Sequence, residues 1–161
     1  GLPYPGGPVI DKLAKLGDEN AFSFPMAKIP GLNCSYSGLK TSFLYFVRDE
    51  LKKNENFIEE RKNDLCASFQ KAVVDTLMAK LKRASRDTGI QQIAVAGGVS
   101  ANSLLRKTIQ EGEEKYNWKT FIPAFEFTTD NAAMIAISGH FKYLKKEFLN
   151  YHFTPYARSK M

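Results

Sequence analysis

The stretch Ile93-Ala94-Val95-Ala96-Gly97-Gly98-Val99-Ser100-Ala101-Asn102-Ser103-Leu104-Leu105-Arg106 decides the fold of this chain. It begins with four small or branched apolar residues without alternation, which is the pattern of a strand buried on both faces. Two glycines follow, and Ser100 then precedes apolar residues at helical spacing, so we expect a helix that Ser100 caps. A strand that turns into a helix in this way places bare backbone beside a positive helix N-terminus, which suits a phosphate or an adenosine.

The glycines of this turn admit two interpretations. Either the backbone at Gly97 and Gly98 approaches a ligand, or the helix packs so tightly on the strand that only small residues fit. Asn102 lies just beyond them, where an amide offers a donor and an acceptor to a ribose hydroxyl or an adenine edge. Ligands of open α/β sheets collect at the carboxyl ends of the strands. We therefore predict that Gly97, Gly98 and Asn102 bind a nucleotide, and the alternative for Asn102 is that it only caps its own helix turn.

The rest of the chain predicts a helix-rich α/β protein with few parallel strands. A second strand is expected at residues 120–123, and the order strand, helix, strand favours a parallel crossover with residues 93–96. A central packing helix is expected from Asp64 to about Arg86. Its apolar stripe consists of Leu65, Phe69, Val73, Leu77 and Leu81.

The bulk composition is that of one globular domain. The chain has 161 residues, 43% of them hydrophobic and 25% charged, with a formal net charge of +6 that favours an anionic partner. No apolar run approaches the length of a membrane span and no signal peptide opens the chain, so we expect a cytoplasmic protein without a membrane partner. Cys34 and Cys66 match no metal spacing, and both are interpreted as structural thiols, Cys34 half-buried and Cys66 in the core.

The beginning of the chain indicates a fragment. It has no initiator Met and opens on the turn-rich residues 1–8, GLPYPGGP. Two parallel strands would make a poor core by themselves, because parallel sheets have more strands and cover on both faces. We therefore expect part of a larger fold, whose exposed sheet edge invites self-association.

Two carboxylates are expected near helix starts. Asp11 follows Pro8 in the first turn of a helix that Gly17 ends, and Asp130 is expected to cap a helix that begins near Ala133. From spacing alone, Asp11 is as much a helix-start acid as a ligand contact, whereas for Asp130 simple capping is the favoured interpretation. A carboxylate at the end of a strand loop can also serve a hard or borderline cation.

Four separated segments resemble one known family, in the family's order. They are residues 4–8 (YPGGP), 34–41 (CSYSGLKT), 96–102 (AGGVSAN) and 127–136 (FTTDNAAMIA). In these segments the chain is similar to the TsaD (YgjD, Gcp) family, the tRNA adenosine threonylcarbamoyltransferases once labelled O-sialoglycoprotein endopeptidases. Cys34 and Tyr36 stand where phenylalanines are usual, and Phe127 and Thr128 replace the usual approach to the last segment.

The resemblance implies a fold larger than this chain. The family has the two-lobed actin-like fold (ASKHA, ribonuclease H-like), with a nucleotide held between the lobes. Residues 1–161 correspond to the C-terminal portion of the second lobe. The family's N-terminal lobe and its HxxxH metal-binding helix have no counterpart in this sequence, so the fragment alone is expected to be inactive.

The resemblance also implies an activity. The family transfers a threonylcarbamoyl group from threonylcarbamoyl-AMP to N6 of the adenosine beside the anticodon in tRNA, which is t6A synthesis. By the same resemblance, Gly7 and Asp11 contact the adenylate, or an ATP-type ligand. Asp130 ligates one divalent metal ion, iron or zinc, that acts as a Lewis acid. The implied partners are tRNA and the TsaB and TsaE proteins.

Three rival functions are weighed. Another actin-fold ATPase or sugar kinase would share the Gly-Gly turn, but the SGLKT and TTDNAAM strings argue against it. A non-catalytic RNA-binding module would use the aromatic and basic residues between 141 and 160, which equally fit an amphipathic helix with a docked tail. A peptidase has little support because the chain has no HExxH motif.

Overall fold

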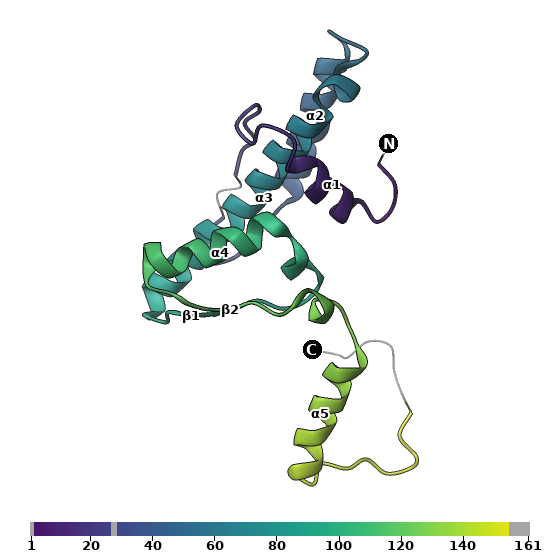
Figure 1. Ribbon diagram of the computed structural model, residues 1–161, viewed down its shortest axis with the longest axis vertical. Helices are drawn as coiled ribbons and strands as arrows, with labels where there is room; N and C mark the ends of the chain where they lie inside the picture. The colour runs from purple at the N-terminus through teal and green to yellow at the C-terminus, as the bar shows by residue number, and fades with distance from the viewer. Residues whose placement is uncertain (1, 27–28, 155–161) are drawn as a thin grey trace. The chain divides into compact units, whose positions relative to one another are not determined.

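The computed structural model describes residues 2–26 and 29–154, which form two compact units divided between Thr128 and Thr129. Figure 1 traces the elements of both units in chain order. In the first unit they are α1 (Gly6–Ala14), α2 (Ser37–Leu51), α3 (Phe57–Thr88), β1 (Gln92–Ala94), the short 3-10 helix η1 (Gly98–Ala101), α4 (Ser103–Tyr116), β2 (Lys119–Phe121) and the 3-10 helix η2 (Phe125–Phe127). The second unit contains α5 (Ala132–Leu144).

The two strands form a parallel pair, as the sequence predicts. Ile93 lies opposite Thr120, and the backbone N–H of Val95 donates to the carbonyl of Phe121 at 3.1 Å. Each strand is three residues long and begins one residue earlier than expected. In the described part of the chain the fold is therefore helix-rich α/β with one two-stranded parallel sheet.

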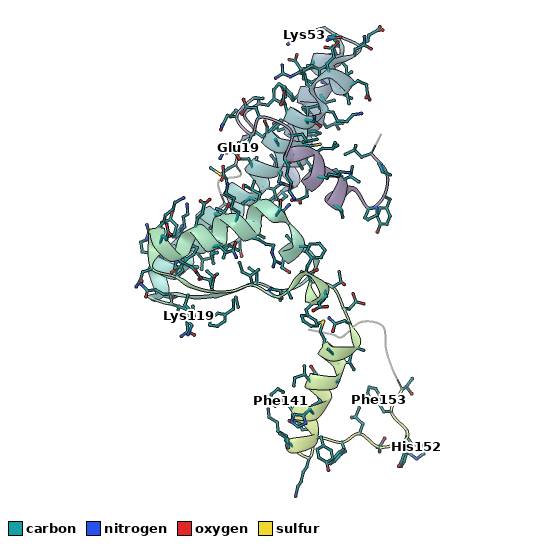
Figure 2. All side chains as sticks on the ribbon, viewed as in Figure 1. Glu19, Lys53, Lys119, Phe141, His152 and Phe153 are labelled. Carbon is teal, nitrogen blue, oxygen red and sulfur yellow. The ribbon has the colours of Figure 1, made fainter. Side chains whose placement is uncertain are left out.

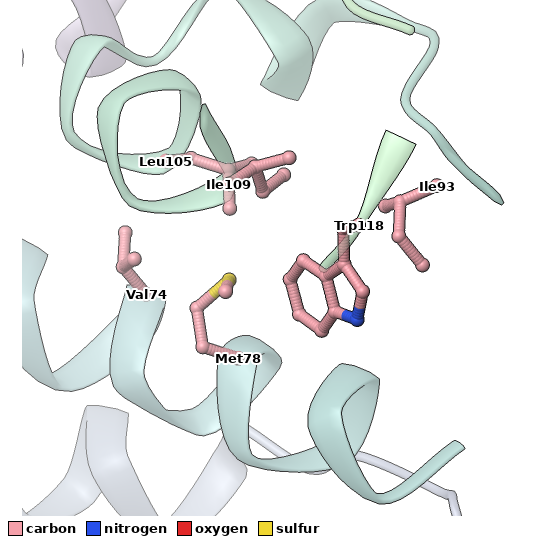
Figure 3. Packing of buried hydrophobic residues seen from close by; sticks show 6 residues of the cluster. All are labelled: Val74, Met78, Ile93, Leu105, Ile109 and Trp118. Carbon is pink, nitrogen blue, oxygen red and sulfur yellow. The ribbon is translucent and has the colours of Figure 1, made fainter. Parts of the chain in front are cut away.

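The larger core lies where α3, α4 and the strands meet. Figure 3 shows its six buried residues: Val74, Met78, Ile93, Leu105, Ile109 and Trp118. Full burial of an aliphatic or aromatic side chain of this size contributes roughly 1.5–3 kcal/mol. Trp118 is a packing residue, as expected, and its indole N–H donates to Ser85 Oγ at 3.0 Å, so its polar edge is satisfied inside the core.

A second, aromatic core joins α2 to α3. Phe24, Leu39 and Ala72 are buried at its centre. Around them lie Phe22, Tyr36, Phe43, Phe46, Phe69 and Val73. The rings of Phe43 and Phe69 are 4.7 Å apart, at the tilted geometry that aromatic pairs prefer.

Helix α3 begins earlier than its periodicity predicts. The expected start at Asp64 is wrong because Phe57 is buried and packs edge-on against Phe22 and Phe46, at centroid distances of 5.7 and 6.0 Å. These contacts hold an additional N-terminal segment of helix, which departs from helical geometry only at Arg61, where φ is −117° and ψ is 17°.

The loop after α1 is fastened directly to α3. Gly17 was expected to cap α1, but Lys15 is the capping residue. A Cβ on Gly17 would instead lie 2.2 Å from the Asn63 carbonyl oxygen, so glycine is required for the close approach of two backbones. The adjacent Asp18 N–H donates to Asp64 Oδ1 at 2.8 Å, and this hydrogen bond, with one from Arg61, lowers the pKa of Asp64.

The two outer edges of the sheet differ. The N–H of Lys119 and the carbonyl of Phe121 make hydrogen bonds on the β1 side, so the N–H of Thr120 between them faces away from β1. This N–H donates to the carboxylate of Glu113 on α4 at 3.1 Å. The Thr120 hydroxyl donates to the same oxygen. Within the described residues no strand pairs with the other edge of β1. The Glu113 side chain already occupies the outer edge of β2, so this edge is not free to pair with another chain. Self-association through an exposed sheet edge therefore stays a prediction for β1 only.

The contact between α4 and Trp118 generates a prediction about Gly112. A Cβ at Gly112 would lie 2.3 Å from Trp118 Cε3, and the indole is fixed by the core and by Ser85. We expect Gly112→Ala to lower the free energy of unfolding by about 1–3 kcal/mol, because the buried ring must move. The measurement is urea-induced unfolding followed by circular dichroism.

Gly38 provides the matched control. It lies in the first turn of α2 in the same unit, and a Cβ there would meet no heavy atom within 4 Å. Gly38→Ala is expected to change stability little or to raise it by up to about 1 kcal/mol. Equal effects of the two substitutions would show that the Trp118 contact does not restrict Gly112.

Candidate functional site

A small hollow brings together two of the residues predicted to bind a nucleotide. Its volume is about 190 Å³, and Gly7 of α1 and Asn102 at the start of α4 both line it, although they are far apart in the sequence. Gln70 of α3 is the other polar residue in its wall. The remaining lining is apolar: Ile10, Phe69, Val73, Val74, Leu77, Val99 and Leu105. An apolar lining with a few convergent amide groups resembles that of small-molecule sites, while the volume is below the roughly 300–1,000 Å³ of most such pockets.

Asn102 is the N-cap of α4. Its Oδ1 accepts from the backbone N–H of Leu105 at 2.9 Å, and its Nδ2 donates to Gln70 Oε1 at 2.9 Å. The capping alternative left open by the sequence is therefore realised, and one Nδ2 N–H remains for a ligand. The prediction that Ser100 caps this helix is wrong, because the chain first makes the turn η1, in which the buried Ser100 hydroxyl donates to the Gly97 carbonyl at 2.7 Å.

The structure excludes one of the two interpretations of the glycines. Gly97 has a φ of 79°, a conformation that favours glycine. A Cβ built on Gly97, Gly98 or Gly7 would meet no heavy atom of the described residues within 4 Å. Tight packing of the helix on the strand is therefore not what requires Gly97 and Gly98, and open space lies beside the backbone at all three positions.

Asp11 connects α1 to α4. Its Oδ1 accepts from both the backbone N–H and the hydroxyl of Ser103, each at 2.9 Å, and its Oδ2 lies 3.5 Å from Lys15 Nζ. The prediction that Asp11 lies in the first turn of α1 is wrong, because α1 begins at Gly6. Its carboxylate instead lies at the positive N-terminus of α4, where a negative charge is favourable. The side chain is 18% exposed, so most of its surface is already used.

Asp130 belongs to the second unit and is exposed. The prediction that it caps α5 is wrong: Asn131 is the N-cap, and its Oδ1 accepts from the Met134 N–H at 3.1 Å. The carboxylate of Asp130 is not used for capping. The described residues contain no group of three or more His, Cys, Asp or Glu side chains that could hold a metal ion, and His140 and His152 are exposed.

The remaining predicted features lie on the surface or in the core. Cys66 is buried, as expected, and burial raises the pKa of its thiol, whereas Cys34 is exposed and its predicted half-buried position is wrong. Figure 2 shows side chains of the aromatic and basic segment, including Phe141, His152 and Phe153; residues 155–160 of this segment lie outside the described residues. Nowhere in the described ranges is there a helix with the length and hydropathy needed to cross a membrane.

Sequence reasoning missed two side chains, Gln70 in the wall of the hollow and Arg106 on α4. Gln70 lies on α3 next to the apolar stripe, and only its hydrogen bond to Asn102 reveals a role. Arg106 donates to the Ser100 carbonyl at 2.9 Å and to the Pro123 carbonyl at 2.7 Å. It therefore joins the loops that follow the two strands. A helix period alone gives no signal for either contact.

Comparison with known proteins relates the chain to one family. The family profile described as TsaD, tRNA N6-adenosine threonylcarbamoyltransferase, matches residues 1–137. Proteins with that name from Christiangramia forsetii and Phocaeicola vulgatus are each 54% identical, over 99% and 98% of this chain. One from Thermosipho africanus is 52% identical over 90% of it. The match spans 47%, 47% and 43% of these relatives, so the chain spans about half of their length.

The double role of Asn102 generates a prediction. Loss of the cap should lower the free energy of unfolding of Asn102→Ala by about 0.5–2 kcal/mol. Asn102→Asp keeps an acceptor for the Leu105 N–H, and Gln70 can turn its amide to donate to the second carboxylate oxygen, so this variant should retain most of the stability. Urea unfolding of both variants is the measurement, and equal losses would show that the cap is not the source of the effect.

Proposed function

This chain belongs to the TsaD family, tRNA N6-adenosine threonylcarbamoyltransferases, and we propose that it forms part of an enzyme that transfers a threonylcarbamoyl group from threonylcarbamoyl-AMP to N6 of an adenosine in tRNA. The single observation that carries the proposal is the convergence of Gly7 and Asn102 on one hollow beside the open Gly97-Gly98 turn. The proposed fold is part of an actin-like lobe, and its parallel strand pair with a helical crossover is consistent with that.

The proposed ligand of the hollow is the adenylate. The walls are apolar enough for a purine ring, and Asn102 retains one N–H that can donate to an adenosine acceptor. At Gly7, Gly97 and Gly98 a ligand can approach the backbone closely because no described atom occupies the space of a Cβ. Asp11 would reach a ribose hydroxyl only through the oxygen that faces Lys15, since its Oδ1 already accepts twice from Ser103.

The proposed divalent ion, iron or zinc, is only partly accounted for by these residues. A stable site takes several ligands, and the described residues offer no cluster of three. Asp130 fits as one ligand, because its carboxylate is exposed and Asn131 does the capping. The further ligands of this ion are proposed to lie outside the described residues. TsaB and TsaE as partners and a cytoplasmic location are proposed with the family assignment.

The first test separates Asp130 from its neighbour. In the complete gene product, Asp130→Ala should lose bound metal and t6A-forming activity while remaining folded. Asn131→Ala should lose the cap of α5, at about 0.5–2 kcal/mol, and keep the metal. Metal content by elemental analysis and activity on tRNA are measured for both variants. Stoichiometric metal in Asp130→Ala would exclude Asp130 as a ligand.

The second test concerns the 161-residue chain by itself. We expect no threonylcarbamoyl transfer to tRNA from this chain, because it offers no complete metal site within its described residues. The complete gene product, assayed in parallel with the same tRNA and threonylcarbamoyl-AMP, is the positive control. Measurable t6A formation by the isolated chain would contradict the expectation.

A further inference from the structure

Gln70 is a buried polar side chain that the proposed function does not use. It lies on α3 with 7% of its surface exposed, beside Phe69 and Val73, and it lines the same hollow as Gly7 and Asn102. Its Oε1 accepts from Asn102 Nδ2 at 2.9 Å across 32 residues of sequence. In apolar surroundings such a hydrogen bond is strong, and the loss of one partner is costly to the other.

The hydrogen bonds around Asn102 fix which way both amides face. The backbone N–H of Leu105 can only donate, so the Asn102 atom beside it must be the oxygen Oδ1. Nδ2 of Asn102 then faces Gln70, and because an N–H₂ group can only donate, Gln70 must present its oxygen. The backbone of α4 thus fixes the orientation of the Asn102 amide, and Asn102 in turn fixes the orientation of the Gln70 amide.

We propose that Gln70 is a positioning residue for nucleotide binding. Its side-chain carbonyl takes one Nδ2 N–H of Asn102 and holds the amide in one position, so that the second N–H is available to an adenosine in the hollow. The inference rests on the proposed function, because it assumes that an adenosine occupies this hollow. Gln70 acts through Asn102 and does not itself touch the reacting atoms.

The test compares two substitutions at Gln70 in the complete gene product. Gln70→Glu keeps an oxygen that accepts from Asn102, whereas Gln70→Met keeps a similar volume and removes the acceptor. The probe is AMP, which contains the adenosine and one phosphate of the proposed adenylate. We expect its dissociation constant, measured by calorimetry, to rise about threefold to tenfold for Gln70→Met, the range of one lost hydrogen bond, and to stay within about twofold of wild type for Gln70→Glu.

Thr76→Val is the matched control. Thr76 is also a buried polar residue of α3, its hydroxyl donates to the Ala72 carbonyl at 2.8 Å, and it does not line the hollow. This variant should leave AMP affinity unchanged, because Thr76 does not touch the hollow. A Gln70→Met variant that lowers the melting temperature but leaves AMP affinity unchanged would overturn the inference, since a purely structural residue changes stability and not affinity.

The remaining outcomes are also decisive. Equal weakening in Gln70→Glu and Gln70→Met would show that the acceptor oxygen is not what matters, and would overturn the inference. Failure of the folded wild-type protein to bind AMP would overturn the proposed function, and the inference with it. Wild-type binding with unchanged affinity in Gln70→Met would remove the inference and leave the proposed function standing.

Discussion

The N-terminus of α4 is the point on which the rest of the first unit depends. The first N–H groups of a helix have no partner within the helix. Here the N–H of Ser103 is taken by Asp11 of α1, and that of Leu105 by Asn102, whose own amide is held by Gln70 of α3. The capping of a single helix end therefore ties three helices together, and it does so beside the Gly97-Gly98 turn.

This arrangement couples stability to the candidate site. Asn102 and Asp11 accept hydrogen bonds from backbone N–H groups of α4. In a complex, the same amide and carboxylate groups would also contact the ligand. Arg106 adds to this by bonding to the carbonyls of Ser100 and Pro123, so the loops after both strands are held by one guanidinium. A site built from groups already fixed by hydrogen bonds needs little reorganisation when a ligand binds.

The sequence predicts those features that depend on local pattern, and misses those that depend on distant partners. The parallel strand pair, the packing of Trp118 and the burial of Cys66 follow from periodicity and residue type. The predictions of caps at Ser100 and Asp130 are wrong because the position of a cap depends on where the chain turns into the helix. The turn η1 moves the cap of α4 from Ser100 to Asn102, and α5 is capped by Asn131, one residue after Asp130. Whether space lies beside a glycine is decided only by what the rest of the chain places there.

The bond between Asp11 and Ser103 has a consequence for how the protein is made. The two residues are 92 positions apart. A ribosome that adds about 5–20 residues per second needs roughly 5 to 18 seconds to proceed from one to the other. During that time α1 has been synthesised but the N-terminus of α4 has not, so Asp11 has no helix end to cap. The hollow, which Gly7 shares with Asn102 and Leu105, can form only after this interval.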